Sequence, residues 1–193
     1  GDIGCFSFYP GKNLGAYGEG GAVTTQRADY ARAVRMLRDW GAEKKYHHEL
    51  KGFNYRLEGV QGAVLGVKMK YIEGWTESRL RLSARYDALL AGGPFGLRDA
   101  PAEVRHVGHV YAISHPKRDA LQAHLQQRGI GTGIHYPIPV HLQPCFAELG
   151  YHVGDFPHSE RAAKETLSLP MYPELTEAQQ DQVVAALRDF AGA

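Results

Sequence analysis

A glycine-rich turn carrying a lysine constrains this chain more than any other feature. It lies between two short β-prone runs, GCFSFYP from Gly4 to Pro10 and GGAVTT from Gly20. Aromatic and β-branched residues favour strands, whereas proline and glycine end them. The turn holds Lys12, and its many glycines leave little side-chain volume for a core. We therefore expect a strand, a turn that a bound ring or phosphate can approach closely, and a second strand.

Helical periodicity follows this segment. Apolar residues recur at helical spacing over 29–40, and again over a long region from about 57 to 90. We expect the long region to bend, or to cross a domain boundary, near Gly74 and Trp75. Residues 41–54 are polar and show no periodicity, so they are predicted to form a loop.

The second half of the chain alternates between strand and helix. We expect a strand at 109–115, a helix at 117–129, a short strand entering a proline-rich loop at 130–144, and a helix followed by a strand at 156–170. Thr176 and Gln179 then form a capping box at the start of a last helix. This alternation indicates an α/β fold.

Composition excludes several functional classes. The 193 residues include 22 Lys and Arg and 21 Asp and Glu, so no basic field for nucleic acid is expected. The apolar runs are too short to span a membrane. The ten histidines show no convincing metal-ligand spacing, and we predict no metal site. Two cysteines make no disulfide framework, and the chain shows no signal-peptide pattern, so we expect a cytoplasmic protein.

The residues alone allow two interpretations of Lys12. A single lysine in a turn is most often simply solvated. An amine held on a turn is also what a Schiff-base nucleophile needs, because a cofactor must be able to reach it. Ser7, five residues earlier, could then place its hydroxyl on a phosphate. Because this spacing and the glycines are each common, the residues alone favour a solvated lysine without a role.

Four longer sequence blocks resemble a known family, and this resemblance bears on the interpretation of Lys12. They are FSFYPGKNLGAYGEGGAV, KYHHELKGFNYRLEGVQGAVLGVKMKYIEGW, GIHYPIPVHLQPCFAELGY and DFPHSERAAKETLSLPMYPELTEAQ. In this order they resemble the DegT-type sugar aminotransferases, which use pyridoxal 5'-phosphate. Gly11 and Leu57 stand where the family often has threonine and methionine, and neither position carries chemistry.

The resemblance implies roles for particular residues. Lys12 would bind the cofactor through an imine and act as general acid and base for the 1,3-proton shift. Ser7 would hold the cofactor phosphate within the subunit, and Asn54 would reach the phosphate of the neighbouring subunit's cofactor. Arg56 is a further substrate-binding candidate, although a surface guanidinium with no role is equally compatible with its position. His135 and Tyr136 would contact the substrate at the mouth of the site.

The resemblance also implies an architecture. The expected fold is that of aspartate aminotransferase (fold type I), working as a homodimer with shared active sites. Residues 1–73 would be the end of the large cofactor-binding domain, and residues 74–193 the small α/β domain. The family's aspartate for the pyridinium nitrogen lies upstream of the lysine, and Asp2 is too close to Lys12 to replace it. The chain also has no initiator methionine. We therefore expect the C-terminal half of an enzyme, inactive in isolation.

The expected activity is transamination of a nucleotide-linked keto-deoxysugar, with glutamate or glutamine as amino donor. One alternative is a non-catalytic remnant of the family that binds a partner through its small domain. Another is an aminotransferase for a cyclitol ketone. A sugar dehydratase of the same fold would, by the resemblance, carry histidine in place of the lysine, so Lys12 argues against it.

Overall fold

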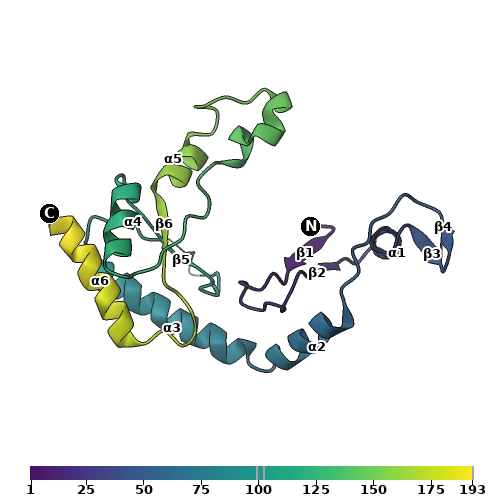
Figure 1. Ribbon diagram of the computed structural model, residues 1–193, viewed down its shortest axis with the longest axis horizontal. Helices are drawn as coiled ribbons and strands as arrows, with labels where there is room; N and C mark the ends of the chain where they lie inside the picture. The colour runs from purple at the N-terminus through teal and green to yellow at the C-terminus, as the bar shows by residue number, and fades with distance from the viewer. Residues whose placement is uncertain (99, 102, 193) are drawn as a thin grey trace. The chain divides into compact units, whose positions relative to one another are not determined.

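The computed structural model describes residues 1–98, 100–101 and 103–192, so Ala193 lies outside the described residues. It divides into two compact units, Gly1–Gly74 and Trp75–Ala193. Each unit contains helices and antiparallel strands, and the α/β expectation is confirmed (Figure 1). No described helix combines the length and apolar character that crossing a membrane requires.

The first unit begins with the two predicted strands. β1 (Gly4–Ser7) and β2 (Gly21–Thr24) pair antiparallel, with Gly4 opposite Thr24 and Ser7 opposite Gly21. Both β-prone runs are therefore strands, as expected, and the lysine-bearing turn joins them. Helix α1 (Ala28–Arg38) follows and matches the helix predicted over 29–40.

The predicted loop at 41–54 contains a small hairpin, so this expectation was wrong in part. β3 (Ala42–Lys44) pairs antiparallel with β4 (His47–His48). The Arg32 guanidinium on α1 bonds both carboxylate oxygens of Glu43 and lies 3.3 Å from Glu49. Strands of two and three residues are too short to show a period-2 pattern, so the sequence alone gave no signal for them.

The long helical region is two helices, α2 (Gly59–Lys68) and α3 (Ile72–Leu90). The break lies a few residues before the expected bend, because Gly74 falls within the first turn of α3. The Tyr71 N–H bonds the Lys68 carbonyl at 2.9 Å, three residues back. Such a contact tightens the last turn of a helix and ends it.

The second unit is built around one antiparallel strand pair. β5 (Tyr111–Ser114) pairs with β6 (Thr166–Leu169). Helices α4 (Arg118–Gln127) and α6 (Glu177–Gly192), together with α3, share one apolar core with these strands. The most deeply buried side chains of this core are Leu82, Tyr86, Tyr111, Ile113, Leu121, Leu125, Leu167 and Leu187.

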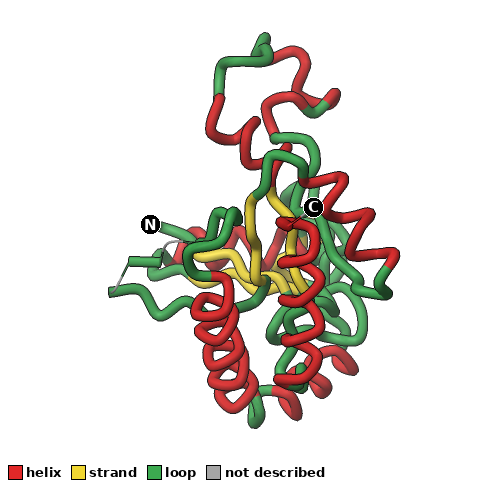
Figure 2. The backbone as a smooth tube through the Cα atoms, turned by 90° about the vertical axis from the view of Figure 1, so that its left-hand side faces the viewer, coloured by secondary structure: helices red, strands yellow, loops and turns green. Residues whose placement is uncertain are grey.

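A long segment leaves this core and returns through α5 (Pro157–Glu165). It contains two 3₁₀ helices, η1 (Val140–Leu142) and η2 (Pro144–Leu149), and extends away from the strand pair of its own unit (Figures 1 and 2). The strand expected within 130–144 is reduced to a single bridge between Gly133 and Ser168. The many prolines that follow cannot donate ladder hydrogen bonds, which explains why pairing stops there.

The capping box of α6 provides a direct test of the fold. Thr176 Oγ1 accepts the Gln179 N–H at 3.2 Å, and Gln179 Oε1 accepts the Thr176 N–H at 2.9 Å. Thr176→Ala should destabilise α6 by about 1 kcal/mol, because the cap hydroxyl is lost. Native-state hydrogen exchange of the α6 amides would measure this loss. Thr176→Ser keeps the hydroxyl and should exchange like the parent; equal protection in the alanine variant would contradict the assignment.

Candidate active site

Lys12 lies on a compact turn at the end of the β1 extension. Its backbone N–H bonds the Tyr9 carbonyl at 2.8 Å, and its side chain is exposed. The turn closes on itself at Gly15, where an added Cβ would lie 2.3 Å from the Pro10 carbonyl oxygen. Only glycine can occupy position 15 without moving the turn. The amine is therefore presented to solvent from a backbone with little freedom.

Backbone contacts with the strand pair hold both ends of the same turn. The Phe8 N–H bonds the Gly20 carbonyl, and the Ala16 N–H bonds the Phe8 carbonyl, both at 2.8 Å. Ala16 is fully buried. The β1–β2 ladder thus continues into the lysine-bearing segment and supports it.

Two side chains of α2 hold the glycine-rich part of the turn. Gln61 is 8% exposed, and its Oε1 accepts the Tyr17 N–H at 2.9 Å. Lys68 donates from Nζ to the Gly15 carbonyl at 2.7 Å and lies 4.7 Å from the Tyr17 ring centroid. Sequence reasoning missed both residues, because these contacts join positions 44 and 53 residues apart. A buried glutamine within an apolar helix was the only available signal.

Ser7 is exposed at the end of β1. Its Oγ accepts the Tyr9 N–H at 3.3 Å. A hydroxyl that accepts one bond still has its own hydrogen to donate. Ser7 can therefore offer a donor to a phosphate oxygen while it stays fixed beside the lysine turn.

Asn54 and Arg56 lie on a segment anchored to the end of α1. Asn54 forms an antiparallel bridge with Asp39, and the Tyr55 N–H bonds the Arg38 carbonyl at 2.9 Å. Arg56 Nη1 lies 2.5 Å from Asp39 Oδ1, with both side chains about half exposed. The Asn54 amide is exposed and can reach a ligand, whereas the charge of Arg56 is already paired.

His135 and Tyr136 belong to the second unit and lie just after the Gly133–Ser168 bridge. His135 Nδ1 is 2.9 Å from the hydroxyl oxygen of the buried Ser168, and its ring packs edge-on to Tyr136 at 5.5 Å. An added Cβ on Gly133 would lie 2.6 Å from the His135 ring. The β6 strand thus orients His135, while Tyr136 remains 70% exposed.

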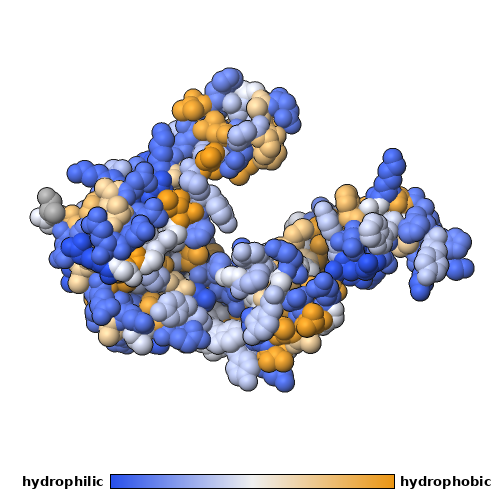
Figure 3. Space-filling view, viewed as in Figure 1, coloured by the Kyte–Doolittle hydropathy of each residue, from blue (hydrophilic) through white to orange (hydrophobic). Residues whose placement is uncertain are grey.

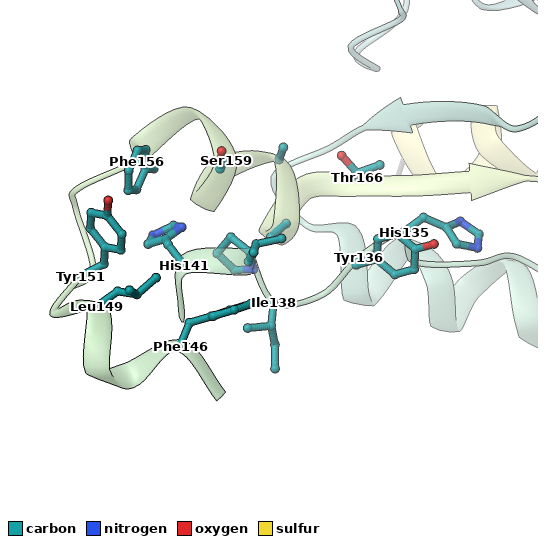
Figure 4. Close-up of a pocket in the computed structure, with 14 residues that line it drawn as sticks. His135, Tyr136, Ile138, His141, Phe146, Leu149, Tyr151, Phe156, Ser159 and Thr166 are labelled. Carbon is teal, nitrogen blue, oxygen red and sulfur yellow. The ribbon is translucent and has the colours of Figure 1, made fainter. Parts of the chain in front are cut away.

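A pocket of about 540 Å³ lies beside these two residues, between the extended segment and α5 (Figure 4). Its walls are largely aromatic and aliphatic. The lining residues include Ile138, Val140, His141, Phe146, Leu149, Tyr151, Phe156, Ser159, Ala162 and Thr166. Its volume falls within the range of about 300–1,000 Å³ that is usual for small-molecule sites. Sequence reasoning placed two residues at this location and missed the pocket itself.

A buried contact between His141 and Glu160 shapes the wall of this pocket. His141 Nε2 lies 3.2 Å from Glu160 Oε1, and both side chains are less than 10% exposed. The Glu160 carboxylate also accepts the N–H groups of Gly154 and Phe156. These contacts, led by the Gly154 N–H, hold the pKa of Glu160 below its usual value. The carboxylate is therefore a fixed anchor for the loop that returns to α5.

Metal chemistry has no support among the residues that the structure describes. Nowhere in this part of the chain do three or more His, Cys, Asp or Glu side chains converge in a metal-binding arrangement. His47 and His48 form the short strand β4 and are exposed, and His48 Nδ1 contacts the Trp40 carbonyl.

Comparison with known proteins identifies the family of the chain. The model of the DegT/DnrJ/EryC1/StrS aminotransferase family matches residues 1–188. The chain is 48% identical over 96% of its length to a "pleiotropic regulatory protein" of Geobacillus stearothermophilus. It is 43% identical over 98% of its length to the dTDP-3-amino-3,4,6-trideoxy-alpha-D-glucose transaminase of Streptomyces venezuelae. The chain spans half the length of each of these relatives.

The fold has a close counterpart among solved structures. The crystal structure of S. venezuelae DesV in complex with a ketimine intermediate superposes with a TM-score of 0.93 at 42% identity. The match covers 99% of this chain and 52% of that one. The expected fold type I architecture is thereby confirmed.

The contact between α2 and the lysine turn can be tested without an activity assay. Gln61→Ala removes the acceptor of the Tyr17 N–H, so that amide should exchange faster by about fivefold, the effect of losing a hydrogen bond worth about 1 kcal/mol. Hydrogen exchange resolved at Tyr17 would measure the change. Gln127→Ala, at an exposed position of α4, is the matched control and should leave Tyr17 unchanged. Unaltered exchange in both variants would show that Gln61 does not hold the turn.

Proposed function

Because the chain belongs to the DegT/DnrJ/EryC1/StrS aminotransferase family, we propose that it is the C-terminal half of a pyridoxal-phosphate-dependent sugar aminotransferase. The complete enzyme transfers an amino group from glutamate or glutamine to the keto group of a nucleotide-linked deoxysugar. One observation carries the proposal: Lys12 presents its amine from a turn that β1, β2 and α2 hold in place. A solvated lysine with no role requires none of these contacts.

The described residues fit one end of the cofactor. Pyridoxal phosphate, when bound, supplies an electron sink for charge that develops at the substrate carbon. The Lys12 amine is a nucleophile suited to the cofactor aldehyde, and it can later move a proton at Nζ. The Ser7 hydroxyl has a hydrogen to donate to the phosphate. Asn54 offers an exposed amide for the phosphate of a neighbouring subunit's cofactor, which makes the active enzyme a homodimer with shared sites.

We assign the two compact units to the two domains of such an enzyme. Residues 1–73 form the end of the cofactor-binding domain, and residues 74–193 the small domain. The observed division after Gly74 supports this assignment. The pyridinium-binding carboxylate then comes from the other half of the protein. The exposed free thiols of Cys5 and Cys145 suit a reducing compartment, and we place the enzyme in the cytosol.

His135 and Tyr136 act as substrate contacts in this proposal. Ser168 holds the His135 ring through Nδ1, which leaves Nε2 to face the ligand. Arg56 contributes less than a free guanidinium, because Asp39 already neutralises part of its charge. The long, anionic substrate supplies binding energy remote from the reacting carbon, and that energy positions the keto group.

Lys12 should be essential in the full-length enzyme. The parent should show a visible absorbance band from the lysine-bound cofactor, and Lys12→Ala should lose both the band and turnover. Lys12→Arg keeps the charge but cannot form the linkage, so it should be equally inactive. Lys117→Arg, at an exposed position before α4, is the matched control and should behave as the parent. A band and turnover retained in Lys12→Arg would place the nucleophile elsewhere.

The substrate class is tested by comparing acceptors with the full-length enzyme. A keto-sugar nucleotide should be aminated with a kcat/KM far above that of the same sugar without its nucleotide, an inosose or a simple 2-oxo acid. The nucleotide supplies the remote binding energy, so removing it should lower kcat as well as raise KM. Equal use of the free sugar or an oxo acid would reject the sugar-nucleotide assignment. Preference for the inosose would favour a cyclitol aminotransferase, and no turnover with any acceptor would favour a non-catalytic relative.

A further inference from the structure

The aromatic pocket of the second unit has no role in the chemistry described so far. We propose that this pocket, between the extended segment and α5, binds the heterocyclic base of the nucleotide-linked substrate. The inference rests on the proposed function and adds to it the location of one part of the ligand. Three features of the pocket carry it: a fixed wall, a cluster of aromatic rings and a polar edge next to the expected substrate contacts.

The wall is fixed by the buried carboxylate of Glu160. Three nitrogens converge on it: the Gly154 N–H lies 2.8 and 3.0 Å from its two oxygens, and the Phe156 N–H and His141 Nε2 each lie 3.2 Å from Oε1. A loop that only covered the surface would not need such an anchor. Anchoring removes the cost of ordering the pocket when a ligand binds.

The rings of the wall suit a flat ligand. His141 lies 4.7 Å from Phe156, and Phe156 lies 5.1 Å from Tyr151, between ring centroids. Figure 4 shows His141, Tyr151 and Phe156 gathered at one end of the pocket. Every nucleobase has a π face, and stacking on aromatic side chains contributes about 1–3 kcal/mol per base. Leu149 and Val140 on the same segment are 58% and 70% exposed. The space-filling view shows hydrophobic residues gathered at the surface of this segment (Figure 3).

The edge of the pocket is polar and reaches the substrate contacts. Ser159 and Thr166 are among the lining residues, and the hydroxyl of each can donate or accept a hydrogen bond. Such groups match the mixed donors and acceptors of a base edge. His135 and Tyr136 line the same pocket, toward its other end in Figure 4. A ligand with its base among the rings can therefore extend its sugar toward these two residues.

Filling the pocket from α5 tests the inference in the full-length enzyme. Ala162 is exposed and lines the pocket, so Ala162→Trp should occupy it without entering the core. The KM for a dTDP-linked keto-sugar, and the Kd for dTMP by calorimetry, should each rise about tenfold or more, as expected when base stacking is lost. The half-reaction with the amino donor alone, followed by the cofactor absorbance, should be unchanged. Ala123→Trp, on the exposed face of α4, is the matched control.

The outcomes separate the pocket from the enzyme activity. Unchanged KM and Kd in Ala162→Trp, with an intact donor half-reaction, would overturn the inference. A Tm of Ala162→Trp far below that of Ala123→Trp would also overturn the inference. It would mean that the tryptophan clashes with protein atoms and that no free pocket exists there. Tyr151→Leu removes one stacking ring without adding bulk and should weaken dTMP binding on its own. If the parent lacks transaminase activity but binds dTMP in a manner sensitive to both variants, the pocket assignment stands and the proposed function fails.

Discussion

The lysine turn depends on its attachment to α2. Glycines at 15, 18, 20 and 21 allow a bound ring or phosphate to approach the backbone closely. They carry no side chains, however, that could pack into a core and hold the turn. Polar contacts replace that core: Gln61 accepts the Tyr17 N–H, and Lys68 donates to the Gly15 carbonyl. The residue that presents the amine and the residues that hold it therefore come from different parts of the sequence. Because the glycines leave the turn without side chains that could pack, contacts from α2 are needed to hold it.

In the second unit, too, hydrogen bonds hold the candidate site residues, here onto the strand pair. The β5–β6 pair closes the apolar core, and β6 continues its hydrogen bonding to Gly133 through Ser168. The buried Ser168 thus joins the core to this segment: its backbone bonds Gly133, and its hydroxyl contacts His135. Beyond this point the chain is held by Glu160 instead of by a ladder. Strand β6 therefore supports the part of the site near His135, and the buried carboxylate of Glu160 supports the loop that leads into α5.

Local patterns predicted those elements whose causes are local. The two strands around the lysine, α1, and the Thr176–Gln179 cap were each visible in a short window of sequence. The β3–β4 hairpin was missed because its strands are too short for periodicity and depend on Arg32 of α1. A bend or a domain boundary was expected near Gly74 and Trp75; the two units divide there, whereas the helical region is interrupted at 69–71. The contact between His141 and Glu160 joins an apparent loop to a helix, and no spacing rule detects such a contact.

The sequence by itself supplied the candidate reactive groups: an amine at Lys12, a hydroxyl at Ser7, and a histidine and tyrosine before a proline-rich turn. It also determined the family, because four ordered blocks carry that information without any coordinates. Only the tertiary structure decided which residues hold these groups in place, and that His141, Tyr151 and Phe156 enclose a pocket. The physical reason is that side-chain identity is encoded position by position. Anchoring and enclosure instead arise from contacts between positions far apart in the chain, which no local pattern specifies.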